Sequence, residues 1–303
     1  MDILGTLQLG FIYAILALGI FITFRVMNTP DLTVDGSFTL GLAVSAVLAM
    51  GGHPLLGLGA GFICGMAAGA LTGLLQTKAR IHPLLAGILT MSGLYSVNLA
   101  VMGGSPNLSL LQSTTIFTVL RRAFPQVPKD YVLLISVVFL SLICVTVLAW
   151  FFRTGIGLAL RATGNNAAMV RASSINSDGM RVLAIALANG FVGLAGAVLT
   201  QYQNYADINA GLGVIVVGLA SVIIGEVVIR KRSILGGLLA AAMGAVIYRL
   251  LIALALYLDF FPAYMLRLVS AVIVTITLAI PQIRELISEA RIRREAQNHA
   301  GNS

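Results

Sequence analysis

Few residues of this 303-residue chain could do chemistry, because only 10% of them are charged. Asp31 and Asp35 stand beside Pro30 and Gly36, next to an apolar stretch, and Arg249 lies inside another apolar stretch. A charged side chain at membrane depth must pair, line water or reach the membrane surface, and such residues often mark a solute path. Asp31, Asp35 and Arg249 are therefore our first candidates for residues of a solute path.

The two acids have two explanations. They could cap a helix that starts near Ser37, since Asp and Ser are frequent N-cap residues. Alternatively, the stretch from Asn28 to Ser37 interrupts a helix, and its irregular backbone lines a solute path. Such backbone lies at membrane depth only where it faces protein or water.

Arg249 is the basic residue that lies deepest in an apolar span. It follows Ile234 by 15 residues, or about 22 Å of helix, so a lipid-facing side chain could still snorkel to the outer surface. Small residues that recur every fourth position from Gly236 instead mark a closely packed helix face. We therefore predict that Arg249 faces the protein interior and pairs with an outer acid, Asp207 before Asp259.

Aromatic residues gather where the apolar spans end, and Tyr202 and Tyr205 are among those on the outer side. Belts of Tyr and Trp at the membrane interface are the default explanation, and a substrate gate is the alternative. We keep Tyr202 and Tyr205 as pathway candidates.

A long polar interruption runs from Arg153 to Arg181, between apolar spans at Tyr131–Phe152 and Val182–Thr200. Each flanking span is close to the roughly 20 residues that a helix needs to cross a bilayer core. The interruption is basic, since it holds one acid and four arginines, namely Arg153, Arg161, Arg171 and Arg181.

A short helix is predicted inside this loop, over Ala167–Ala172, with Asn165 or Asn166 as its N-cap. Positions i, i+1 and i+4 form a small apolar face, which consists of Ala168, Met169 and Ala172. The loop is either an ordinary positive cytoplasmic loop or a docking element that presents an apolar knob, ringed by arginines, to a soluble partner. For Arg171, membrane orientation is a slightly better explanation than an ion pair with that partner.

Composition determines the class of protein. The chain is 58% hydrophobic and has a mean hydropathy of +0.98, whereas a soluble domain carries about 25% charged residues. Its apolar spans are too long for β-barrel strands, so we predict an all-α, polytopic membrane protein.

The net charge of +8 lies mostly in short loops, which indicates membrane orientation and no nucleic-acid partner. The Cys and His residues lie in no ligand-like spacing, so no metal site and no cofactor are expected.

About nine membrane-spanning helices are predicted, with eight or ten as alternatives. The predicted spans are Leu7–Phe24, Phe38–Met50, Leu55–Leu75, Leu84–Met102, Tyr131–Phe152, Val182–Thr200, Gly211–Ile229, Ile234–Leu258 and Tyr264–Ile280. The second is short because the polar stretch Asn28–Ser37 precedes it. The first is expected to be retained, since no basic segment of the signal-peptide type precedes it.

Lys and Arg in the short loops predict the orientation. With the Arg153–Arg181 loop inside, 14 of the 19 basic residues are inside; beyond the loop's four they are Arg25, Lys78, Arg80, Arg230, Lys231, Arg232, Arg284, Arg291, Arg293 and Arg294. Those outside are Arg121, Arg122 and Lys129. The N-terminus is then outside and the C-terminus inside.

Glycine recurs every fourth residue along the third span, at Gly57, Gly61, Gly65, Gly69 and Gly73. This spacing exposes backbone along one helix face, so a neighbouring helix is expected to pack closely there.

Several functions are disfavoured by what the sequence lacks. It contains no GxxxxGK[ST] phosphate-binding loop and no HExxH or GxSxG motif. Acids within the spans are nearly absent, although ion-coupled carriers usually place them near the membrane midplane. An ion-coupled secondary transporter is therefore the alternative function, and a structural or assembly protein the third.

The segment from Gly157 onward resembles the cytoplasmic loop and following helix of ABC-importer permeases of the branched-chain amino acid and ribose group. The matching positions are Gly157, Arg161, Ala162, Asn165, Met169, Ile175, Asn176 and Gly196. The segments NTPDLTVDGSFTLG and GLASVIIGEVVIRKRSILGG resemble the same group, and RATGNN with DLTVDGSF looks most like its tryptophan/tyrosine uptake permeases. Asn165–Asn166 replaces an acidic or mixed pair common in the branched-chain members.

The resemblance implies a permease subunit with no catalytic site of its own. Such a subunit dimerises in the plasma membrane of a bacterium, among membrane lipid, and binds two cytoplasmic ABC ATPase subunits. It receives an amino acid or similar small solute from an extracytoplasmic solute-binding protein. The expected coupling residues are Arg161, Asn165, Asn166, Ala168, Met169, Arg171 and Ala172. We expect a membrane domain over residues 1–281, with 153–181 as its coupling loop, and a basic cytoplasmic tail over 282–303.

Overall fold

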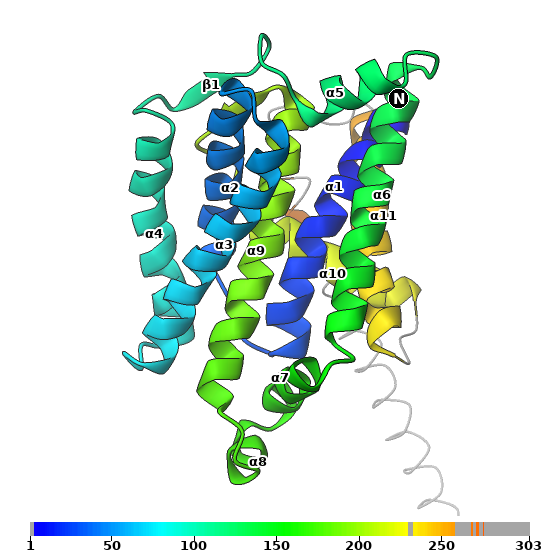
Figure 1. The fold of residues 1–303 in the computed structure, drawn as a ribbon. Helices are drawn as coiled ribbons and strands as arrows, with labels where there is room; N and C mark the ends of the chain where they lie inside the picture. The colour runs from blue at the N-terminus through cyan, green and yellow to red at the C-terminus, as the bar shows by residue number, and fades with distance from the viewer. Residues whose placement is uncertain (1–2, 230–232, 258–267, 269–270, 273–274, 276–303) are drawn as a thin grey trace, which may run out of the picture.

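The computed structural model describes residues 3–229 and 233–257, together with 268, 271, 272 and 275. These residues form a bundle of long helices (Figure 1), which confirms the all-α membrane class. The helices are α1 (Ile3–Ile20), α2 (Thr33–Met50), α3 (Pro54–Thr77), α4 (Pro83–Val101), α5 (Ile116–Ala123), α6 (Lys129–Phe151), α7 (Gly155–Asn165), α8 (Ala167–Ala172), α9 (Ser177–Gln203), α10 (Val214–Val228) and α11 (Ile234–Tyr257). A π-helical turn, η1 (Phe21–Val26), continues α1.

Eight of the nine predicted spans correspond to helices among the described residues. Within the described residues, seven helices are long and apolar enough to cross a membrane, and α10 is a shorter apolar helix. The predicted seventh span, Gly211–Ile229, begins only at Val214, since residues 209–213 form a non-helical entry to α10. The predicted ninth span, Tyr264–Ile280, falls largely outside the described residues, and so does the tail at 282–303.

The second span is a full-length helix rather than a short one, because α2 begins at Thr33. Its polar first turn lies inside the protein, where the hydroxyls of Thr33 and Thr72 hydrogen-bond at 2.8 Å. The predicted interruption is therefore confined to the non-helical residues 27–32. The polar stretch Asn28–Ser37 was predicted to be an interruption of the helix, whereas residues 33–37 belong to α2 and the polar side chain of Thr33 has a partner in the bundle.

Helix α9 forms the centre of the bundle and packs against α1, α2 and α3. The glycines of α3 lie directly on its backbone: a Cβ at Gly65 would collide with the carbonyl oxygen of Asn189, and one at Gly69 with that of Ile185. The predicted close-packing face of α3 is thus confirmed, and its partner is α9. In the same way, Gly244 of α11 lies against the carbonyl of Ser221 in α10.

The bundle has two distinct ends (Figure 1). At one end lies α8, which we call the α8 end; at the other lie α5 and the N-terminal end of α1. Strands β1 (Asn107–Ser109) and β2 (Tyr205–Asp207) form an antiparallel pair at this second end, with Asn107 opposite Asp207. We call it the strand end. Coupling-loop residues and strand-end residues are thus separated by the length of the spans.

Candidate coupling helix and solute path

Helix α8 has the predicted bounds, Ala167–Ala172, and Asn166 is its N-cap. The Oδ1 atom of Asn166 accepts hydrogen bonds from the backbone N–H groups of Ala168 at 3.1 Å and Met169 at 3.0 Å. A side-chain oxygen at this position satisfies donors that the first helical turn leaves unpaired. Asn166 thus explains why so short a helix can form at the tip of the loop.

The two faces of α8 differ sharply in exposure. Val170 is buried, with 1% of its surface exposed, and it anchors the helix, whereas Met169 is 59% exposed. The expected knob residues Ala168 and Ala172 are exposed with it, as is Arg171. Helix α8 therefore exposes an apolar side chain beside a basic one at the α8 end.

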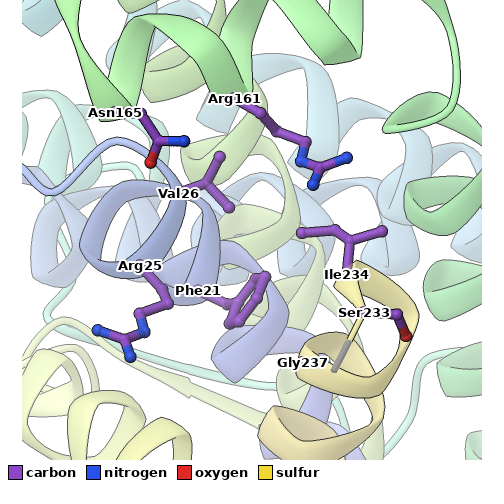
Figure 2. Close-up of a pocket in the computed structure, with 8 residues that line it drawn as sticks. All are labelled: Phe21, Arg25, Val26, Arg161, Asn165, Ser233, Ile234 and Gly237. Carbon is purple, nitrogen blue, oxygen red and sulfur yellow. The ribbon is translucent and has the colours of Figure 1, made fainter. Parts of the chain in front are cut away.

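Arg161 and Asn165 belong to α7 and not to the exposed face of α8. Thr154 caps α7 through a 3.2 Å bond from the N–H of Gly157. In Figure 2, Arg161 and Asn165 line a pocket together with Arg25 and Ile234. The predicted coupling set is therefore divided by the structure into a group on α8 and a pair on α7, of which Arg161 is half-buried and Asn165 exposed.

Asp31 is buried and holds three elements together. One carboxylate oxygen accepts the N–H of Thr33 at 3.0 Å, and the other accepts the side-chain amide of Asn189 at 2.6 Å. Asn189 also donates to the carbonyl of Ile185. It lies 12 residues into the 27-residue helix α9, near the middle of the bundle. Asp31 therefore ties the non-helical segment before α2 to the centre of α9.

Asp35 does not cap the helix to which it belongs. Its carboxylate accepts the N–H of Gly213 and the N–H of Ile215, both at 2.9 Å, and these groups lie at the start of α10. Gly213 has a φ of +80°, a left-handed conformation that glycine adopts without strain. The N-terminus of α10 is thus held by an acid that is 178 residues away in the sequence.

Two cavities adjoin this capped helix start. One, of about 590 Å³, is lined by Tyr13, Asp207 and the first residues of α10. The other, of about 340 Å³, is lined by Asp35 and Tyr95 among others. Leu212 lines both cavities. The start of α10 therefore borders two cavities at the strand end, one lined by Tyr205 and Asp207 and the other by Ile208.

Arg249 points into the protein, as predicted, but the observed contact is with an aromatic ring. Its guanidinium carbon lies 3.8 Å from the centre of the Tyr13 ring, a cation–π contact between α11 and α1. Its Nε is buried and has no hydrogen-bond partner among the described residues. The predicted partner Asp207 instead accepts the N–H of Asn209 at 2.8 Å. The second choice, Asp259, lies outside the described residues.

The two candidate tyrosines have different surroundings. Tyr202 donates to Oε1 of Gln8 at 2.8 Å and packs edge-on against Phe117 of α5, so it joins α9 to α1 and α5. Tyr205 is 49% exposed and lines the larger cavity. Of the pair, Tyr205 is the one that borders a hollow.

Comparison with known proteins decides the family. The family model described as "Branched-chain amino acid transport system / permease component" matches residues 3–278. The chain belongs to this family. It is 33% identical to a tyrosine transport system permease protein of Clostridioides difficile, over 91% of this chain and 90% of that protein. It is also 26% identical to the ribose import permease protein RbsC of Escherichia coli, over 79% of this chain and 74% of that protein. No solved structure matches it.

The family assigns the chain its part in a larger assembly. It is the permease component of an ABC-type transport system, a multi-pass protein of the bacterial inner membrane. ATP hydrolysis belongs to a separate subunit, and a binding protein is a further partner.

Sequence reasoning missed two residues of this permease that the structure brings to the predicted ones. Tyr13 stacks under Arg249 and packs on Phe38 with ring centres 6.4 Å apart. Asn189 binds Asp31. A lone Tyr or Asn in an apolar span only weakly indicates a functional residue. It does indicate that the side chain has a partner inside the protein, since polar groups there generally do.

Proposed function

We propose that this permease moves an amino acid, with aromatic amino acids as the first candidates, into a bacterial cell. The name of the tyrosine transport relative supports this solute class. The passage would run between the two cavities at the start of α10, with Asp35, Arg249 and Tyr205 beside it. Asp31 and Tyr202 would hold the surrounding helices in position, because their bonds are to other helices of the bundle.

Coupling to the ATPase would occur through α8. The observation that carries this proposal is the exposed Met169 on a short helix that is anchored by buried Val170 and capped by Asn166. Such a knob fits an apolar groove on a soluble partner, and Arg171 and Ala172 would lie at the rim of the contact. Arg161 and Asn165 would connect α8 to the base of α1. Movement of the ATPase would then reach the spans as rigid-body motion.

We further propose that the α8 end faces the cytoplasm and the strand end the exterior. The basic residues of the coupling loop support this orientation, with the N-terminus outside and the C-terminus inside. Residues 1–281 would form the membrane domain and 282–303 a cytoplasmic tail. Two copies of the chain would assemble as a homodimer within the lipid bilayer, as in the permeases that the sequence resembles.

An uptake assay tests the proposal. The permease is reconstituted in proteoliposomes with its ATPase, and a binding protein loaded with radiolabelled tyrosine is supplied outside. ATP enclosed in the vesicles should drive tyrosine uptake, and a vesicle lacking ATP is the control. Uptake that follows an imposed proton or sodium gradient without ATP would contradict the proposal. A binding protein that retains a sugar in place of an amino acid would contradict the solute class.

A further inference from the structure

A pocket of about 300 Å³ lies at the α8 end, and it shares Arg161 and Asn165 with the coupling set but lies apart from the proposed solute path. It is formed by three elements that are distant in sequence: the π-helical turn η1, helix α7 and the start of α11 (Figure 2). The span Ile3–Val26 ends here and the span Ile234–Tyr257 begins here. The pocket therefore lies where two candidate membrane spans end, and we infer that it lies at the level of the lipid headgroups.

The lining of the pocket carries excess positive charge. Arg25 forms an ion pair with Glu226 at 2.8 Å. Arg161 is half-buried and forms no ion pair with any acid that the structure describes. Burial of an uncompensated guanidinium is costly, and an anion beside Arg161 would reduce that cost.

Further polar groups point to an oxygen-rich ligand. Asn165 and Ser233 line the pocket with Arg161 and offer an amide and a hydroxyl. Ser233 stands at the N-terminal end of α11, where its Oγ accepts the N–H of Gly236 at 3.1 Å. The positive end of the α11 dipole adds to the field of Arg161. The flat guanidinium fork matches the oxygens of a phosphoryl group.

The remaining lining is apolar, and it consists of Phe21, Val26, Ile234 and Gly237. A site that offers cationic and polar groups beside apolar side chains (Figure 2) suits a ligand that is itself amphipathic. Basic pockets between helices on the cytoplasmic side bind anionic headgroups in membrane proteins.

We propose that this pocket binds a phosphoryl group, supplied by an anionic phospholipid, with Arg161 as its main ligand. The phosphodiester contacts Arg161, Asn165 and Ser233, and the glycerol and upper acyl chain lie against Phe21 and Ile234. The bound lipid joins α7 to α1 and α11 beneath the coupling helix. Free phosphate offers the same oxygens without the apolar part, so the test below compares the two sources.

The test measures lipid retention by native mass spectrometry of the full chain purified in detergent. Phosphatidylglycerol is titrated against phosphatidylcholine, whose headgroup has no net charge. We expect selective retention of phosphatidylglycerol by the wild type and about tenfold weaker retention by Arg161→Gln, the effect of losing one charge-assisted hydrogen bond. Arg161→Lys keeps the charge and should show an intermediate loss, which also checks that the site still folds.

Arg153→Gln is the matched control, since Arg153 is an exposed arginine of the same loop that does not line the pocket. It should retain phosphatidylglycerol as the wild type does. Thermal shifts with millimolar inorganic phosphate form the second arm: a shift that Arg161→Gln abolishes, without lipid selectivity, would assign the phosphoryl site to free phosphate. If Arg161→Gln and Arg153→Gln behave alike towards both probes, the site does not exist.

Discussion

Replacing Asp35 with alanine should release the first turn of α10. The carboxylate of Asp35 accepts two backbone N–H groups there, from Gly213 and Ile215, each at 2.9 Å. Alanine leaves both groups without this acceptor. Asparagine keeps one carbonyl oxygen and can therefore hold one of the two.

The size of the effect follows from these two bonds. Removing an N-cap side chain costs about 0.5–2 kcal/mol, and a hydrogen bond to a charged group contributes about 1.5–3 kcal/mol. Water that enters from the adjoining cavities offsets part of this loss. We therefore expect Asp35→Ala to lower the free energy of local opening at the α10 start by about 2 kcal/mol, which raises the population of the open state roughly 30-fold. Asp35→Asn should lower it by about 1 kcal/mol, or roughly fivefold.

Hydrogen–deuterium exchange of a peptide that covers residues 208–218 measures this opening, because the exchange rate follows the population of the locally open state. Asp178→Ala is the control, since Asp178 is an exposed acid in the first turn of α9. It should leave exchange in 208–218 unchanged. Wild-type exchange of this peptide in Asp35→Ala would refute the assignment of Asp35 as the cap of α10.

Uptake by the Asp35→Asn variant separates the two explanations of this acid. Normal uptake at normal expression would assign Asp35 to capping alone. A selective loss of uptake, with the protein expressed and the α10 start closed, would assign its charge to the solute path.

Three further predictions concern α8, α3 and α11. Met169→Asp should insert in the membrane but fail to copurify with the ATPase, because burying an unpaired charge at the contact costs several kcal/mol; copurification at wild-type yield would contradict docking through α8. Gly65→Leu should abolish the folded peak in size-exclusion chromatography, since its side chain would collide with the backbone of α9, whereas Gly59→Leu, where no atom lies within 4 Å of the added Cβ, should leave the peak intact. Arg249→Leu should abolish tyrosine uptake while ATPase copurification stays normal, and undiminished uptake would show that its contact with Tyr13 is structural only.

Features that depend on residues close together in the sequence could be predicted from the sequence. The apolar runs indicate membrane helices because every backbone group in lipid must be paired within its own segment. The bounds of α8 were predicted correctly because an N-cap asparagine bonds to groups two and three residues ahead of it. The glycine spacing of α3 likewise indicates a bare helix face whatever packs on it. The spacing did not reveal that α9 is the helix against this face.

Only the tertiary structure decided which polar groups meet. Capping of its own helix was one of the two explanations for Asp35, yet Asp35 caps α10, 178 residues away. Asp31 binds Asn189, 158 residues away. Arg249 was expected to find an acid, and its guanidinium lies on the ring of Tyr13. Burial requires that a polar side chain have some partner, so the sequence determined that these residues face the interior. The choice of partner depends on which helices become neighbours, and that is a property of the whole bundle's packing.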